Sequence, residues 1–118
     1  MTLKRGDVVI VRFPFSSGSG AKFRPALVIQ NDRNNSRLLN VILAAITTTV
    51  HRDDEPTQYL LRVRSAEGKQ SGILKDSVVT CENIVTVEQS LIHRTIGSLP
   101  AESMHRVDAC VRAALGLH

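Results

Sequence analysis

The sequence predicts a small, mainly β fold that ends in one helix. Several short runs of β-branched and apolar residues alternate with polar turns, a pattern typical of a curled sheet or small barrel. The last run instead repeats its apolar residues at spacings of three and four, as a helix does. With 118 residues, no internal repeat and no linker, the chain is expected to form a single domain over residues 1–118.

The first two strands flank a loop of serine and glycine. Residues 8–13 are dominated by β-branched side chains and predict a strand, which a proline ends. The loop at residues 16–20 costs backbone entropy to order. Arg24 precedes Pro25, a position that favours extended geometry, and residues 26–29 predict a buried strand. Arg24 therefore sits where a loop meets a strand, a common place for functional side chains.

The middle of the chain alternates between strands and polar segments. Residues 31–36 predict a polar turn, and residues 38–47 predict a third strand that closes in three threonines. Beyond a charged loop, residues 58–63 predict a strand with one face in water. A second polar turn is expected around Gly68 at residues 65–70.

The last third holds the remaining strands and the helix. Residues 78–87 return to β-branched side chains and predict a strand, and one more short strand is expected around Leu91 and Ile92. The apolar spacing predicts a helix over residues 101–115. Ser98 is expected to cap its N-terminus and Gly116 its C-terminus.

Composition and charge narrow the function classes. Aromatic residues make up only 3% of the chain, which argues against a module that stacks nucleic-acid bases on aromatic rings. The net charge of +4 favours a polyanionic partner. Cys81 and Cys110 lack zinc-ligand spacing, so no metal site is expected and both thiols should be free. With neither a signal peptide nor a membrane-length apolar run, the chain is expected to be a soluble cytoplasmic protein.

Four sequence blocks occur in a characteristic order. They are Arg-Gly-Asp-Val-Val at residues 5–9, Phe-Arg-Pro-Ala-Leu-Val-Ile-Gln-Asn-Asp at 23–32, Ala-Ala-Ile-Thr at 44–47, and Ser-Gly at 71–72 leading to Asp-Ser-Val-Val at 76–79. Together they resemble the MazF/PemK family of toxin endoribonucleases. The resemblance implies an SH3-like barrel of the MazF/CcdB type, a homodimer and cleavage of single-stranded RNA without a metal or other cofactor. It also implies an antitoxin whose acidic segment covers the RNA groove.

The resemblance also assigns roles to individual residues. Arg24, in its Arg-Pro context, matches the family's catalytic arginine, and Thr47 matches its catalytic threonine. Asp76 and Ser77 match an Asp-Ser pair that lies near the active groove in the family. Asp76 has three candidate roles: to orient Arg24, to hold RNA hydroxyls or to cap a turn. The other residues expected to contact RNA are Lys22, Gln30, Thr48, His51 and Lys75.

These residue types suit RNA cleavage by the neighbouring 2′-OH, which leaves a 2′,3′-cyclic phosphate and a 5′-OH. The planar guanidinium of Arg24 offers paired donors to phosphate oxygens, but it stays protonated and is a poor general base. Its expected role is therefore to stabilise the charge that builds up at phosphorus, aided by the hydroxyl of Thr47. His51, four residues past Thr47, is the nearest histidine in the sequence, and a plain loop histidine is the favoured interpretation of it.

Three other functions remain open at this point. One is a CcdB-like toxin that binds DNA gyrase without catalysis, and Arg24 and Thr47 argue against it because such binding does not need them. Another is a plain SH3-like binding module, which the low aromatic content disfavours since proline-rich grooves are lined with aromatic rings. The last is a degenerate toxin that folds without cutting, because residues 16–21 lack the acidic residue that some relatives carry there.

Overall fold

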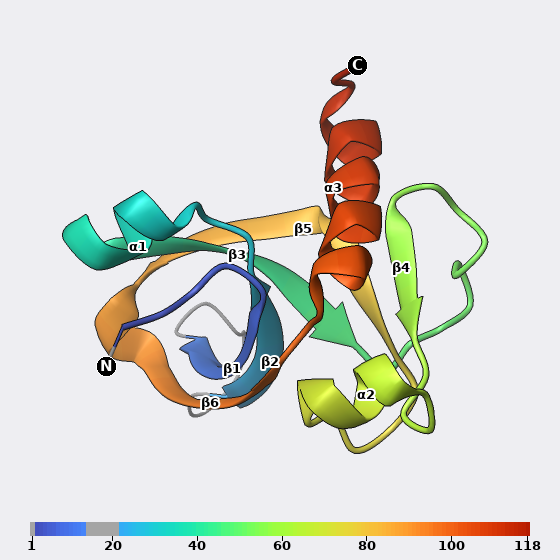
Figure 1. Cartoon of the computed structure of the whole chain (residues 1–118), viewed down its shortest axis with the longest axis horizontal. Coiled ribbons are helices and arrows are strands. Elements are labelled where there is room, and N and C mark those ends of the chain that lie inside the picture. The colour runs from blue at the N-terminus through green and yellow to red at the C-terminus, as the bar shows by residue number, and fades with distance from the viewer. Residues whose placement is uncertain (1, 14–21) are drawn as a thin grey trace.

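The computed structural model describes residues 2–13 and 22–118 (Figure 1). The loop expected at residues 16–20 lies outside these ranges. Within them, six antiparallel strands form one sheet in the order β4-β5-β3-β2-β1-β6. The strands are β1 (Asp7–Phe13), β2 (Lys22–Val28), β3 (Asn40–Thr47), β4 (Gln58–Leu61), β5 (Ser77–Glu88) and β6 (Ile92–Ser98). The helices are α1 (Asp32–Arg37), α2 (Ala66–Ser71), the 3-10 turn η1 (Gln89–Leu91) and α3 (Ala101–Leu115).

The sheet curls, so that its two faces bury two separate apolar clusters. In Figure 1, β1, β2, β6 and part of β5 close into a ring. The register of β3 against β5 shifts between Ala44 and Ala45, which bends the long strand β5. The inner cluster fills the inside of the curl and comprises Leu3, Val9, Val11, Ala26, Val28, Val41, Leu43, Val87 and Ile92. The outer cluster lies between the sheet and α3 and includes Leu27, Ile46, Val79, Met104 and Val107.

The terminal helix confirms the prediction from apolar spacing. Met104, Val107 and Cys110 are buried against the sheet, and Gly116 ends the helix with a φ of 70°. The predicted N-cap is wrong. Ser98 belongs to β6, and Pro100 occupies the cap position without a side-chain hydrogen bond. Proline suits this end of a helix because the first N–H groups have no partner inside the helix.

Two segments predicted as turns are short helices. In α1, the side chain of Asn31 accepts a hydrogen bond from the backbone N–H of Asn34 at 2.8 Å. In α2, the Oγ of Ser65 accepts one from the backbone N–H of Gly68 at 3.0 Å. The same small polar side chains that favour turns also cap helix N-termini, and here capping prevails.

The remaining strands differ from prediction mainly at their ends. The third strand begins at Asn40 instead of residue 38, and the fourth ends at Leu61 instead of residue 63. The short strand expected around Leu91 and Ile92 is longer, running from Ile92 to Ser98 as β6.

Both cysteines are free and buried in the outer cluster, as the sequence predicts. Burial raises the pKa of the Cys81 thiol to about 12, and it also raises the pKa of Cys110. Both side chains are therefore protonated at neutral pH and pack as small apolar groups. Among the described residues, none of the helices combines the length and the apolar character that a membrane span requires.

Candidate active site

The two predicted catalytic residues lie on neighbouring strands. Arg24 is in β2 and Thr47 is the last residue of β3. These strands pair antiparallel, with Ala26 opposite Ala45. The pairing ends at these two residues, and strand alternation directs the side chains of Arg24 and Thr47 to the same face as Ala26 and Ala45. The two strands thus carry a guanidinium and a hydroxyl on one face of the sheet, each two residues beyond the last paired position.

The pair lies where the inner face of the sheet opens to solvent. Side chains alternate along a strand, so Arg24 shares its face with Ala26 and Val28 of the inner cluster. Unlike those residues, Arg24 is exposed, and Thr47 is half-buried. The guanidinium forms no hydrogen bond or ion pair with another described residue. No other described residue therefore competes with an anion for these donors.

Thr47 also shapes the turn that follows β3. Its Oγ1 accepts a hydrogen bond from the backbone N–H of Thr49 at 3.1 Å. Since a hydroxyl carries one donor and two acceptor sites, its O–H can still donate to a ligand. The contact fixes the oxygen at the end of the strand, on the face that also carries Arg24.

Asp76 and Ser77 each form a hydrogen bond with backbone groups near the start of β5. Oδ1 of Asp76 accepts the backbone N–H of Val63 at 2.8 Å, which joins this segment to the residues after β4. Ser77 is buried, and its hydroxyl donates to the carbonyl of Lys75 at 2.8 Å. Among the described residues, Asp76 has no ion pair with Arg24. The contact that Asp76 makes joins two segments thirteen residues apart in sequence, so it differs from the turn cap considered among its three roles.

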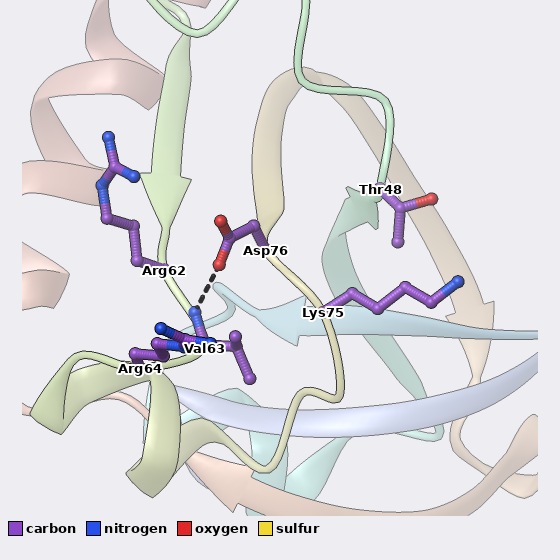
Figure 2. Close-up of a pocket in the computed structure, with 6 residues that line it drawn as sticks. All are labelled: Thr48, Arg62, Val63, Arg64, Lys75 and Asp76. Carbon is purple, nitrogen blue, oxygen red and sulfur yellow. Dashed lines mark hydrogen bonds between the residues drawn. The ribbon is translucent and has the colours of Figure 1, made fainter.

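Two hollows lie beside this region and share part of their lining. The first, of about 770 Å³, is lined by Thr48, Arg62, Val63, Arg64, Lys75 and Asp76 (Figure 2). The second, of about 620 Å³, includes Ile10, Pro25, Ile73, Leu74, Ser77 and Arg94 in its lining. Both contain Thr48 and Lys75, so they adjoin each other at these residues. Thr48, which follows Thr47, lines both hollows, and Pro25, which follows Arg24, lines the second; Arg24 and Thr47 do not line either one.

Of the other residues expected to contact RNA, some are exposed and one is buried. Lys22 is exposed at the start of β2, and His51 is exposed in the segment between β3 and β4. Gln30 requires a correction. It is only 5% exposed, and its Nε2 donates to Oδ1 of Asn35 and to the carbonyl of Asn40, both at 3.0 Å. Gln30 therefore ties α1 to the start of β3 and offers its amide N–H groups to protein acceptors instead of RNA.

Sequence reasoning missed three cations that the fold brings to the hollows. Arg62 and Arg64 line the first hollow, and Arg94 lines the second. The only sequence signal was the pair of arginines flanking Val63. Their meaning depends on the pairing of β4 with β5, which sets Leu61 opposite Ser77 and so brings Arg62 near Asp76.

The side chain of Arg52, by contrast, forms ion pairs with two carboxylates. Its guanidinium lies 2.5 Å from Oε2 of Glu55 and 2.5 Å from Oε1 of Glu82. The hydrogen bond from Arg52 lowers the pKa of Glu55, and hydrogen bonds from Thr57 and Arg52 lower the pKa of Glu82. No group of three or more His, Cys, Asp or Glu side chains in residues 2–13 and 22–118 is arranged to hold a metal ion.

Comparisons with known proteins show the family and the fold. Residues 4–115 match the family model of the PemK-like, MazF-like toxin of type II toxin–antitoxin systems. The chain is 33% identical to Endoribonuclease EndoA of Bacillus subtilis, over 99% of this chain and 97% of that protein. The structure matches Mycobacterium tuberculosis toxin MazF-mt6 with a TM-score of 0.77 and 26% identity, over 95% and 98% of the two chains. This likeness confirms the predicted fold.

A further similar structure is a mycobacterial endoribonuclease in complex with its cognate antitoxin. It matches with a TM-score of 0.75 and 24% identity, over 98% of this chain and 97% of that one. This match shows that the two chains share a fold.

Proposed function

The chain belongs to the PemK-like, MazF-like toxins of type II toxin–antitoxin systems, and we propose that it is an endoribonuclease whose reaction needs no metal. It cuts single-stranded RNA at a short recognised sequence. The 2′-OH next to the scissile bond gives up its proton and attacks phosphorus, the bond to the 5′ oxygen breaks, and that oxygen takes up a proton. The products carry a 2′,3′-cyclic phosphate and a 5′-OH. The observation that carries this proposal is the placement of Arg24 and Thr47 on one face of two adjacent strands, where the sheet opens to solvent.

Arg24 is the main source of charge stabilisation in this mechanism. As the 2′-oxygen attacks, negative charge grows on the non-bridging phosphate oxygens. A guanidinium presents two parallel N–H donors that match these oxygens, and charge-assisted hydrogen bonds are stronger than neutral ones. Because Arg24 has no competing partner among the described residues, it need not break an existing ion pair to bind the phosphate.

Thr47 adds a neutral donor to the same phosphate. Its oxygen is held by the N–H of Thr49, so the hydroxyl is oriented before the substrate arrives. A donor that is already in place costs no reorganisation when charge develops, which is the basis of oxyanion stabilisation. Together the two residues position the phosphate for attack and stabilise its added charge, the two tasks that a metal ion performs in other nucleases.

The proposed partners follow from charge as well as family. We propose that the chain forms a homodimer and is inhibited by an antitoxin whose acidic segment covers the RNA-binding surface. One solved relative is a complex with its cognate antitoxin. Here the net charge is +4, and Arg62, Arg64, Lys75 and Arg94 line the two hollows that share Thr48 in their lining. Such a surface attracts an acidic segment and RNA alike, which allows one to exclude the other.

Replacing Thr47 by valine is expected to lower kcat for RNA cleavage about a hundredfold, because the transition state loses one oriented donor. Valine keeps the shape of threonine but removes the acceptor of the Thr49 N–H, so circular dichroism should be unchanged and stability should fall by about 1 kcal/mol. Thr47→Ser retains the hydroxyl and should restore most of the rate. Cleavage would be followed on a long single-stranded RNA under single-turnover conditions.

Thr49→Val is the matched control for this test. Thr49 is exposed two residues along and contributes its backbone N–H, which valine also has. Its kcat should stay within about twofold of wild type, as expected of a surface substitution. Wild-type cleavage by Thr47→Val would contradict the proposed role of the hydroxyl. Absence of cleavage by the wild-type protein itself would favour the gyrase-binding or degenerate alternatives.

A further inference from the structure

The described residues that line the first hollow carry a net positive charge, with three cations and one carboxylate. Arg62, Arg64 and Lys75 are exposed around it and form no side-chain hydrogen bond or ion pair with another described residue (Figure 2). Other arginines are paired: Arg5 with Asp108 at 2.5 Å, and Arg52 with two glutamates. The hollow contains one carboxylate, Asp76, which already accepts the Val63 N–H.

The backbone that carries Arg62 and Arg64 is held on both sides. The carbonyl oxygen of Arg62 accepts two hydrogen bonds from Ser65. The backbone N–H of Ser65 donates at 3.1 Å and its side-chain hydroxyl donates at 2.7 Å. Gly68 of α2 packs so closely that an added Cβ would lie 1.9 Å from the same carbonyl oxygen. Together with the Asp76 contact, these interactions fix the segment before any ligand binds. A preorganised site loses less conformational entropy on binding.

The hollow reaches Thr48, the residue that follows Thr47 in sequence. Lys75 continues from it into the second hollow. A single strand whose scissile phosphate lies at Arg24 and Thr47 can therefore run past Thr48 and bring another phosphate into the hollow. The lining favours RNA over a peptide, because Val63 is its one apolar residue and peptide grooves need apolar anchors.

We propose that Arg62, Arg64 and Lys75 form a subsite for a non-scissile phosphate of the RNA substrate. This inference rests on the proposed function and adds residues to it. The guanidinium groups and the ammonium bind the phosphate oxygens through charge-assisted hydrogen bonds and release counterions from the strand. The subsite fixes where the RNA lies relative to Arg24, and takes no part in bond breaking.

The test removes two of the charges and measures the salt dependence of binding. The double variant Arg62→Gln, Arg64→Gln is compared with a control, Arg33→Gln, Arg112→Gln, which loses the same charge from α1 and from the far end of α3. Both control positions are exposed and lie on elements directed away from α2 in Figure 1. The probe is a fluorescent 2′-O-methyl oligonucleotide of the cleaved sequence, which lacks the attacking hydroxyl, and binding is read by fluorescence anisotropy.

Loss of the single phosphate contact should reduce the slope of log Kd against log salt by about 0.7, the value for one neutralised phosphate on a single strand. At low salt, Kd and KM should rise about tenfold, while kcat stays within about twofold. The control should keep a slope close to that of wild type. A slope and Kd no different from the control, or a loss confined to kcat, would overturn the proposal.

Neutral phosphates then identify the contact. Methylphosphonate is placed at one linkage of the oligonucleotide at a time. At the linkage that occupies the hollow, wild type and double variant should bind equally, since the contact is already lost. A difference that persists at every linkage would indicate diffuse attraction and refute a defined subsite. Unchanged RNA binding with weaker binding of a polyglutamate peptide would assign the hollow to an acidic protein segment and refute it too.

Failure of the proposed phosphate subsite can be distinguished from failure of the proposed endoribonuclease function. If wild type cuts no RNA, the proposed function fails. The anisotropy comparison would then use a 2′-O-methyl oligonucleotide of mixed sequence, and would still show whether the two arginines contact phosphate. If wild type cuts and the double variant binds and cuts as the control does, only the subsite fails.

Discussion

Replacing Arg24 by alanine is expected to slow RNA cleavage about a thousandfold or more, the upper range for losing one preorganised donor to a developing anion. The guanidinium contributes both charge and two hydrogen bonds, whereas Thr47 contributes one neutral donor, so this effect should exceed that of Thr47→Val. Stability should change by less than about 0.5 kcal/mol, because Arg24 is exposed and has no partner among the described residues. Single-turnover cleavage and thermal unfolding measure the two quantities.

Arg24→Lys separates charge from geometry. Lysine keeps the positive charge but lacks the planar fork, so it should recover only a small part of the rate. Arg112→Ala removes an exposed arginine from α3 and serves as the control, with expected activity close to wild type. Full activity in Arg24→Ala would contradict the proposed mechanism. If Arg24→Ala lowered the free energy of unfolding enough to account for the lost activity, Arg24 would act on the fold instead of on catalysis.

Replacing Gly72 by alanine is expected to destabilise the fold by about 3 kcal/mol or more, through backbone strain and a backbone clash. Gly72 ends α2 with a φ of 80°, a conformation that alanine adopts only with strain. Its added Cβ would also lie 2.2 Å from the carbonyl oxygen of Ile96 in β6. To relieve that contact, α2 must move away from β6. Chemical denaturation measures the loss.

Gly116→Ala isolates the strain from the clash. Gly116 has a similar φ of 70°, but an added Cβ would meet nothing within 4 Å. Its substitution should therefore cost only the conformational penalty of about 1 kcal/mol. Equal destabilisation by the two substitutions would contradict the close packing of Gly72 against β6. Because Gly72 also lines the second hollow, Gly72→Ala is expected to weaken RNA binding as well.

The fold was predictable where side-chain periodicity is strong. The β-branched run of β1 and the apolar spacing of α3 both appear in the structure. The two short helices were not predictable in the same way, since six residues hold fewer than two helical turns and show no clear period. Their start depends on whether Asn31 and Ser65 close a turn or cap a helix. Local sequence favours both outcomes.

The site was predictable only in part, for a related reason. Arg24 and Thr47 were found through motif blocks, and strand register then explains why residues far apart in sequence belong together. Arg62 and Arg64 were missed because their position beside Lys75 depends on the pairing of β4 with β5. Gln30 was misassigned because its partner Asn35 lies on a helix that the sequence did not reveal.

The most direct test of the central proposal is the chemistry of the product ends formed in the presence of EDTA. A long single-stranded RNA would be cut, and the fragments identified by mass spectrometry and by their response to kinase and phosphatase. We expect discrete cuts that carry 2′,3′-cyclic phosphate and 5′-OH ends, unaffected by the chelator. Loss of cleavage in EDTA, or products with 3′-OH and 5′-phosphate ends, would indicate metal-assisted attack by water and contradict the roles proposed for Arg24 and Thr47.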